Sequence, residues 1–230
     1  TYDATTSASL NTGSVSYGGL VFGDNLTGTY SGMFNNANVG SGKTVTITSS
    51  YSGADVNNYT ITDQSSTTAD IAAKVLTATA STANKTYNRS TTAATTLTFT
   101  GLVGSETLGQ TVGSTFDNKN VGTGKTVTVN SITLADGTGL AANYSISSGQ
   151  TTTANITAKS LTVSGITASN KTYDGNTVST LDASSVAYSG LVGGDIFVGA
   201  YAGAFSVKNV GSGTTVTITP SYTGADVSNY

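Results

Sequence analysis

Few side chains in this sequence could carry chemistry, because its 230 residues include no His and no Cys. Thiol nucleophiles and Cys-based metal sites are therefore excluded. The first candidates for acid–base catalysis are Asp3 and Asp174, which each follow a tyrosine. The same short motif occurs three times in the sequence, and its second copy has Asn88 at this position. Asparagine can accept a hydrogen bond but cannot act as a carboxylate base. We therefore predict a turn in which this side chain caps local backbone beside a buried tyrosine.

Three aspartates in loops are candidate calcium ligands: Asp55, Asp136 and Asp226. Calcium takes six to eight oxygen ligands, usually with several carboxylates close together in the sequence. No segment here has that density of carboxylates, so the main expectation is that these aspartates stabilise turns. They are kept as weak calcium candidates, and no cofactor, metal or catalytic residue is predicted.

A glycine-rich stretch, Asn209-Val-Gly-Ser-Gly-Thr-Thr-Val-Thr-Ile218, occurs three times and resembles a phosphate-binding loop. In each copy the residues that follow alternate between Thr and β-branched apolar residues, which indicates a strand. A phosphate site of this kind needs the N-terminus of a helix after the loop. We therefore predict a glycine turn followed by a central strand in each copy. The glycines of these turns are Gly40, Gly42, Gly122, Gly124, Gly211 and Gly213.

Other short motifs recur in the same order with a period of about 85 residues. They include a Gly-Leu-Val motif and two tyrosine motifs. The tyrosines that serve as repeat anchors are Tyr2, Tyr87 and Tyr173 in the first motif and Tyr59, Tyr144 and Tyr230 in the second. This period is too long for one rung of a β-helix or for the common helical repeats, and it fits a small β-domain. We predict three domains, at residues 1–73, 74–158 and 159–230.

Short β-prone runs alternate with turn signals along each copy, whereas no 3.6-residue apolar period persists for three turns. The sequence therefore predicts an all-β fold of three tandem β-sandwich-like domains, with mostly antiparallel strands. Each closing strand runs almost directly into the next opening strand, as at Ile71-Ala-Ala-Lys74. Such short connections predict semi-rigid stacking, end to end, as a rod on the order of 100 Å long.

The first domain is expected to lack its opening strand and the third its closing strand, because no equivalent of residues 60–85 precedes or follows them. The favoured interpretation is a window on a longer tandem array, since the chain starts at Thr1 rather than Met. The alternative is that another repeat or an identical chain supplies the missing strand by strand complementation.

Composition excludes several further classes of function. The net charge is only −3, and no basic patch exists that could follow a nucleic-acid backbone. No apolar run approaches the length of a membrane span. The repeated Tyr and Thr could contact glycans, but we expect them mainly to fill cores and cover sheets.

The motifs of the third copy resemble YDG-type repeats, which are related to MBG repeats. The resemblance is carried by Lys171-Thr-Tyr-Asp-Gly175, by Lys208-Asn-Val-Gly-Ser-Gly-Thr-Thr-Val-Thr-Ile218 and by Gly224-Ala-Asp-Val-Ser-Asn-Tyr230. Such repeats occur in large bacterial secreted adhesins and filamentous-haemagglutinin-like surface proteins. The resemblance implies a non-enzymatic, extracellular or cell-surface segment that acts as a stalk or fibre. The alternative is an extracellular module that binds a glycan or a protein through loops or sheet edges.

Overall fold

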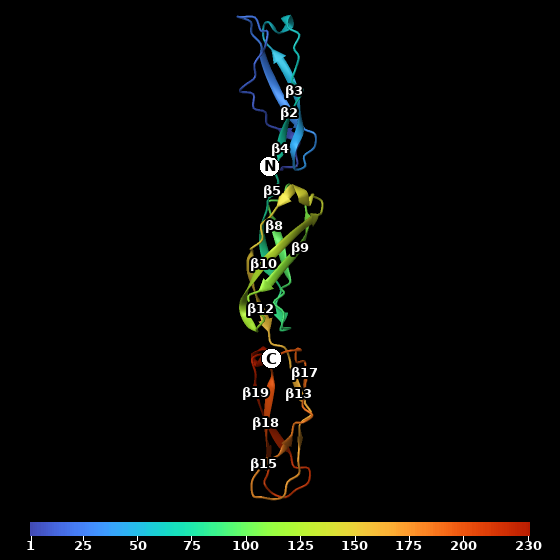
Figure 1. Cartoon of the computed structure of the whole chain (residues 1–230), viewed down its shortest axis with the longest axis vertical. Coiled ribbons are helices and arrows are strands. Elements are labelled where there is room, and N and C mark those ends of the chain that lie inside the picture. The colour runs from blue at the N-terminus through green and yellow to red at the C-terminus, as the bar shows by residue number, and fades with distance from the viewer. The chain divides into compact units, whose positions relative to one another are not determined.

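The computed structural model describes residues 1–230, and it contains only strands, loops and three single-turn 3-10 helices (Figure 1). The prediction of an all-β fold is confirmed. No helix has the length and apolar character needed to cross a membrane. The chain forms two compact units, and the division between them falls inside strands of the second repeat. Unit 1 comprises Thr1–Thr79, Leu97–Val112 and Ile132–Ser148, and unit 2 comprises Ala80–Thr96, Gly113–Ser131 and Gly149–Tyr230.

The first repeat is built on one antiparallel sheet with the strand order β1-β2-β3-β4. Its elements are β1 (Ser7–Ala8), β2 (Thr27–Phe34), β3 (Gly40–Ser52), η1 (Val56–Asn58) and β4 (Ser66–Ile71). Strands β2 and β3 form a long hairpin in which Thr27 pairs with Ser52 and Phe34 pairs with Val45. Along β2 the exposed and half-buried residues alternate strictly, as a sheet with one solvated face requires.

The second repeat contains a four-stranded sheet of order β7-β12-β10-β9 and the two-stranded sheets β6-β8 and β11-β5. Its elements are β5 (Lys74–Val75), β6 (Thr77–Thr82), β7 (Lys85–Thr86), β8 (Thr95–Thr100), β9 (Leu108–Phe116), β10 (Gly122–Asp136), η2 (Ala141–Asn143), β11 (Tyr144–Ser145) and β12 (Thr151–Thr157). The pairings β11–β5 and β12–β7 are parallel, and every other pairing with a defined register is antiparallel.

The third repeat contains a hairpin, β18–β19, that is equivalent to the β2–β3 hairpin of the first repeat. Phe205 pairs with Val216 in it, as Phe34 pairs with Val45 in the first repeat. Its elements are β13 (Thr162–Ser164), β14 (Thr167–Ala168), β15 (Val178–Ser179), β16 (Leu181–Asp182), β17 (Ala187–Ser189), β18 (Val198–Phe205), β19 (Val216–Thr223) and η3 (Val227–Asn229). Strand β15 extends the hairpin to three strands, and β13-β17 and β14-β16 form two small sheets.

The glycine motif differs from the predicted turn in its first two copies. Strand β3 begins at Gly40 and β10 begins at Gly122, and the register with the neighbouring strand shifts between Gly40 and Lys43 and between Gly122 and Lys125. The glycines therefore form a β-bulge inside the ladder, because a closing strand, β4 or β12, lies beside them. In the third copy no strand pairs with the glycines, and β19 begins only at Val216.

Only the second glycine of each motif adopts the left-handed backbone conformation, with φ of +66° at Gly213. We expect Gly213→Ala to destabilise the protein by about 1 kcal/mol, because a Cβ is disfavoured at positive φ. Gly211→Ala should have a smaller effect, since the φ of Gly211 lies outside that region. Urea denaturation followed by circular dichroism measures both variants. Equal midpoints for the two variants would contradict this role of Gly213.

Two clusters of buried side chains each include residues from two neighbouring repeats. In unit 1 the buried cluster joins Tyr2 and Ile71 of the first repeat to Leu76 and Tyr144 of the second. In unit 2 the cluster contains Tyr87, Phe116, Val127 and Ile156 of the second repeat, with Val192 and Tyr230 of the third packed against it. Each compact unit therefore contains one junction between repeats, which we call joint 1 and joint 2.

Candidate functional site at the repeat joints

Joint 1 is centred on an acidic side chain that accepts hydrogen bonds from two tyrosines. The Tyr2 hydroxyl donates to Glu106 Oε1 at 2.6 Å, and the Tyr144 hydroxyl donates to Glu106 Oε2. The two rings pack edge to face with their centroids 5.4 Å apart. The Tyr144 hydroxyl also accepts a hydrogen bond from the backbone N–H of Val103. The connection between β4 and β5 also holds Tyr2, because the backbone N–H of Tyr2 donates to the carbonyl of Ala72.

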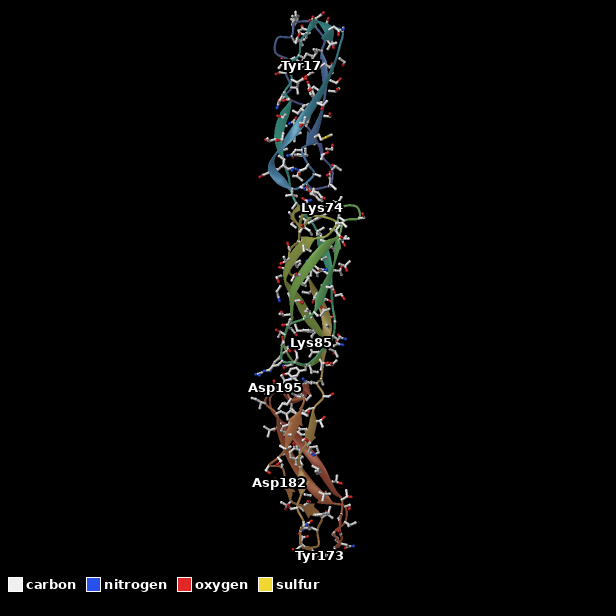
Figure 2. The ribbon with its side chains drawn as sticks, turned by 90° about the vertical axis from the view of Figure 1, so that its right-hand side faces the viewer. Tyr17, Lys74, Lys85, Tyr173, Asp182 and Asp195 are labelled. Carbon is white, nitrogen blue, oxygen red and sulfur yellow. The ribbon has the colours of Figure 1, made fainter.

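Joint 2 repeats this arrangement with equivalent residues. Tyr87 donates to Asp195 Oδ1 at 3.1 Å and Tyr230 donates to Asp195 Oδ2 at 2.6 Å. The rings again pack edge to face, at 5.7 Å between centroids. The Tyr230 hydroxyl accepts from the N–H of Val192 at 2.8 Å. Figure 2 shows Asp195 close to the level of Lys85, at this junction, whereas Tyr173 lies at the opposite end of the third repeat.

A buried asparagine forms a second hydrogen-bonded contact in each joint. In joint 1, Asn143 Oδ1 accepts from the N–H of Val39 at 2.9 Å and Asn143 Nδ2 donates to Asn38 Oδ1. In joint 2, Asn229 makes the same contact, because its Oδ1 accepts from the N–H of Val121 at 2.9 Å. Asn143 and Asn229 are 2% and 0% exposed. Each asparagine is the last residue of a single-turn 3-10 helix and stands directly before the tyrosine of the second motif.

The two joints differ in charge. In joint 2, Arg89 Nε lies 3.4 Å from Asp195 and Lys119 Nζ lies 2.8 Å from Asp226. Lys119 lowers the pKa of Asp226, and Asp226 raises the pKa of Lys119, so both directions agree with an ion pair.

In joint 1 the positions of both cations are occupied by alanine, Ala4 and Ala37. In joint 2 the carboxylate of Asp226 accepts a hydrogen bond from the backbone N–H of Ile196. The equivalent N–H in joint 1 is that of Thr107, and it donates to the hydroxyl of Thr138. Joint 1 therefore has the neutral Thr138 where joint 2 has the carboxylate of Asp226. The residue opposite is Ala37 in joint 1 and Lys119 in joint 2.

The four tyrosines of the joints have raised pKa values. The hydrogen bond to Glu106 and burial raise the pKa of Tyr2 to about 12, and burial and the hydrogen bond to Asp195 raise that of Tyr230 to about 12. Burial, followed by the same carboxylates, also raises the pKa of Tyr87 and Tyr144. The folded joints therefore favour the neutral phenols, which are the hydrogen-bond donors.

This direction predicts a loss of stability at alkaline pH. In the unfolded chain tyrosine titrates near pH 10, at about its ordinary pKa. A raised pKa in the folded state means that the contribution of Tyr2 is intact below about pH 10 and is lost as the pH rises towards about 12. Urea midpoints measured across this range should fall more steeply for the wild type than for Tyr2→Phe, which has no phenol to ionise. Parallel curves would contradict this contribution of Tyr2.

The remaining residues predicted from sequence occupy structural positions. Asp3, Asn88 and Asp174 each accept a hydrogen bond from the backbone N–H two residues later, which is the expected local turn. Gly42 and Gly124 donate their N–H groups to side chains of the closing strands.

The calcium candidates are used as backbone acceptors. Asp55 accepts from the N–H of Asn25, Asp136 from that of Ala141, and Asp226 from that of Ile196. No group of three or more His, Cys, Asp or Glu is placed to hold a metal ion.

The anchor tyrosines are not all buried, contrary to prediction. Tyr2 and Tyr87 are 5% and 1% exposed, whereas Tyr173 is 56% exposed. Within this chain no following repeat covers Tyr173, and the burial of the other two depends on that cover. Tyr59 donates to Asp24 at 2.6 Å, which reproduces the Tyr230–Asp195 contact without a tyrosine from a preceding repeat.

Sequence reasoning missed the acid at the centre of each joint. Asp24, Glu106 and Asp195 each stand three residues after the valine of the Gly-Leu-Val motif. Alignment of the three copies on that motif shows an acid at this position in every repeat, and this was the available signal.

The chain is thus an all-β protein of tandem repeats, and each of its two clusters of buried side chains includes residues of two neighbouring repeats. The family model of the YDG domain matches residues 1–69, 72–154 and 157–230. These segments cover nearly the whole sequence, and the chain belongs to the YDG domain family. A search of curated proteins found no match. A search of solved structures found none either.

Proposed function

We propose that this chain is a structural repeat segment of a bacterial extracellular adhesin or surface filament, and that it acts as a semi-rigid stalk or fibre. The supporting observation is the pair of joints, where two tyrosines share one carboxylate and an asparagine bonds to the neighbouring repeat. Such contacts fix the orientation of one repeat on the next, which a spacer needs. The rod form, the surface location and a role in adhesion or biofilm are parts of this proposal.

The connections between repeats also support a stiff spacer. Only Ala72 and Ala73 separate β4 from β5, so few backbone dihedrals are free at joint 1. At joint 2 the N–H of Lys159, just after β12, donates to the carbonyl of Asn229. The connecting backbone is therefore itself hydrogen-bonded into the third repeat.

Small-angle X-ray scattering of the dilute chain tests the stalk proposal. We expect an extended profile with a maximum dimension on the order of 100 Å, as three repeats of about 30 Å each placed end to end would have. A double variant, Tyr2→Ala with Tyr87→Ala, should give a more flexible profile. A compact profile for the wild type would contradict the proposal. An antibody against the chain that fails to label intact producing cells would contradict the surface location.

One feature of the first repeat favours the alternative of a binding module for glycans. A cavity of about 1050 Å³ is lined by aromatic and polar side chains, among them Tyr17, Tyr30, Tyr51 and Asp63. Aromatic faces with nearby hydrogen-bonding groups suit the apolar faces and hydroxyls of sugars. A glycan array probed with the wild type and with Tyr51→Ala tests this function. Binding that the variant loses would support it, and the absence of binding by the wild type would contradict it.

A further inference from the structure

Each joint brings together two different surfaces. The surface of the earlier repeat, which we call the tyrosine end, carries the first-motif tyrosine, the residue two positions after it and the residue directly before the Asn-Val pair. The surface of the later repeat, which we call the acid end, carries the carboxylate shared by the tyrosines, the residue directly before it and the side chain that accepts from the backbone N–H directly after it. The tyrosines and the shared carboxylate recur in both joints, whereas the other positions differ.

The position two residues after the first-motif tyrosine has a left-handed backbone in every copy. The φ values are +63° at Ala4, +65° at Arg89 and +79° at Gly175. A Cβ is disfavoured in this conformation, so glycine fits the position without strain. A strained residue of this kind points to a role for its side chain. In Arg89 that side chain contacts the third repeat.

The Arg89 side chain lies where a glycine of the third repeat leaves room for it. Arg89 Nη1 donates to the carbonyl of Gly193 at 2.7 Å, and Arg89 Nε lies 3.4 Å from Asp195 Oδ1. A Cβ on Gly194 would lie 1.8 Å from Arg89 Nη1. The side chain of Asp195 is fully buried. A side chain at position 194 would therefore push the guanidinium away from a buried carboxylate.

Joint 1 has the opposite combination of sizes. Ala4 stands where joint 2 has Arg89, and Ser105 stands where joint 2 has Gly194. Joint 1 thus combines a small residue on the tyrosine end with a side chain on the acid end. Joint 2 combines a large residue on the tyrosine end with a glycine on the acid end.

The second difference between the joints is one of charge. Lys119 Nζ lies 2.8 Å from Asp226 Oδ1, and Asp226 is only 7% exposed. Joint 1 has Ala37 and Thr138 at these positions. A tyrosine end with alanine in place of Lys119 would leave the carboxylate of Asp226 buried without its cation, and an unpaired buried charge is strongly destabilising.

We propose that two residue pairs, Arg89 with Gly194 and Lys119 with Asp226, determine which repeat can pack against which. A tyrosine end with arginine and lysine accepts an acid end with glycine and aspartate. A tyrosine end with two alanines accepts an acid end with neutral hydroxyl side chains at both positions. An exchange of partners between the joints would bury Asp226 without a cation or place Arg89 against a serine. Selectivity thus comes from the cost imposed on the wrong neighbour.

This inference deepens the proposed function, because it names the kind of repeat that each end of a spacer unit accepts, and it rests on that function for its biological setting. Chains of similar repeats can misassemble when repeats pack out of order. Selective joints disfavour such misassembly. The two proposals can fail separately, since scattering of the dilute chain tests the stalk and energetic coupling inside joint 2 tests the selectivity.

Two backbone amides report the opening of the joints in the full chain. The N–H of Val121 donates across joint 2 to Asn229 Oδ1, and the N–H of Val39 donates across joint 1 to Asn143 Oδ1. Hydrogen exchange of each amide, resolved by NMR, gives the equilibrium constant for opening of its joint. The amide of Val39 is the internal control that shows whether a variant in joint 2 leaves joint 1 folded.

A double-mutant cycle tests the charged pair. Lys119→Ala should raise the opening constant at Val121 at least about fivefold, because Asp226 loses its cation. In the Asp226→Asn background, where no carboxylate is left unpaired, Lys119→Ala should raise it less than about twofold. The matched control is Lys208→Ala, an exposed lysine at the equivalent position of the third repeat, which should not change it. An equal effect of Lys119→Ala in both backgrounds would overturn the proposal.

A second cycle tests the size pair. Gly194 has a φ of +85°, so Gly194→Ser introduces backbone strain whether or not an arginine lies beside it. The displacement of the guanidinium occurs only where Arg89 is present. Gly194→Ser should therefore raise the opening constant at Val121 at least about fivefold more in the wild type than in the Arg89→Ala background. The same factor in both backgrounds would overturn the role of Arg89 and Gly194 in selecting the neighbour.

Discussion

Replacing Tyr87 by Ala should lower the free energy of unfolding by about 3–5 kcal/mol, the range for removing a large buried aromatic side chain. Tyr87 is 1% exposed within the cluster of joint 2, and its loss also leaves one oxygen of Asp195 without its phenol donor. The packing against Tyr230 is lost at the same time. Tyr87→Phe should cost less, because the ring stays and only the hydroxyl is removed.

The chain contains a matched control in the same Lys-Thr-Tyr motif. Tyr173 is 56% exposed, so Tyr173→Ala should change the free energy of unfolding by less than about 0.5 kcal/mol. Urea denaturation followed by circular dichroism compares the two variants under the same conditions. Similar destabilisation by both would show that the motif acts within its own repeat, and that the contact with the next repeat contributes little.

Replacing Glu106 by Ala should destabilise joint 1 by about 2–4 kcal/mol, because two tyrosine hydroxyls lose their charged acceptor together. Tyr2 and Tyr144 are each 5% exposed, so water cannot fully replace the carboxylate.

The control for Glu106 is Asp24→Ala, at the equivalent position of the first repeat. Asp24 accepts from one tyrosine, Tyr59, rather than two, so a much smaller change is expected. Thermal unfolding of the two variants at equal protein concentration measures the difference. An effect of Glu106→Ala no larger than that of Asp24→Ala would contradict a shared acceptor as the centre of joint 1.

The fold class could be predicted because its signals are local. The alternation of Thr with apolar residues around Val45 and Val127 follows directly from the two-residue period of a strand. The run Thr95-Thr-Leu-Thr-Phe-Thr100 has the same alternation and forms the single strand β8. Hydrophobic periodicity is sufficient for elements of this kind.

The joints could not be predicted from single motifs, because their contacts join residues far apart in the sequence. Tyr2 and Glu106 are 104 residues apart and Tyr87 and Asp195 are 108 residues apart. A tyrosine motif that recurs in every repeat indicates a buried side chain, yet it contains no information about which repeat packs on that side chain. The prediction of a buried tyrosine was consequently wrong for Tyr173.

The glycine motif shows a second limit of local reasoning. The residues Asn-Val-Gly-x-Gly predict a turn, and the positive φ of Gly42, Gly124 and Gly213 agrees with that prediction. Whether the glycines form a turn or a bulge is decided by a closing strand some 30 residues later, as with Gly124 and Asn155. Local sequence sets the backbone angles, and the neighbouring strand sets the hydrogen-bonding role.

The central claim is that each tyrosine motif stabilises the following repeat rather than only its own. Hydrogen exchange measured by mass spectrometry on the wild type and on Tyr87→Ala tests it most directly. We predict that the variant loses protection in the third repeat, around Val192 and Tyr230, as well as around Tyr87 itself. Loss confined to the residues around Tyr87, with unchanged protection in the third repeat, would contradict the account.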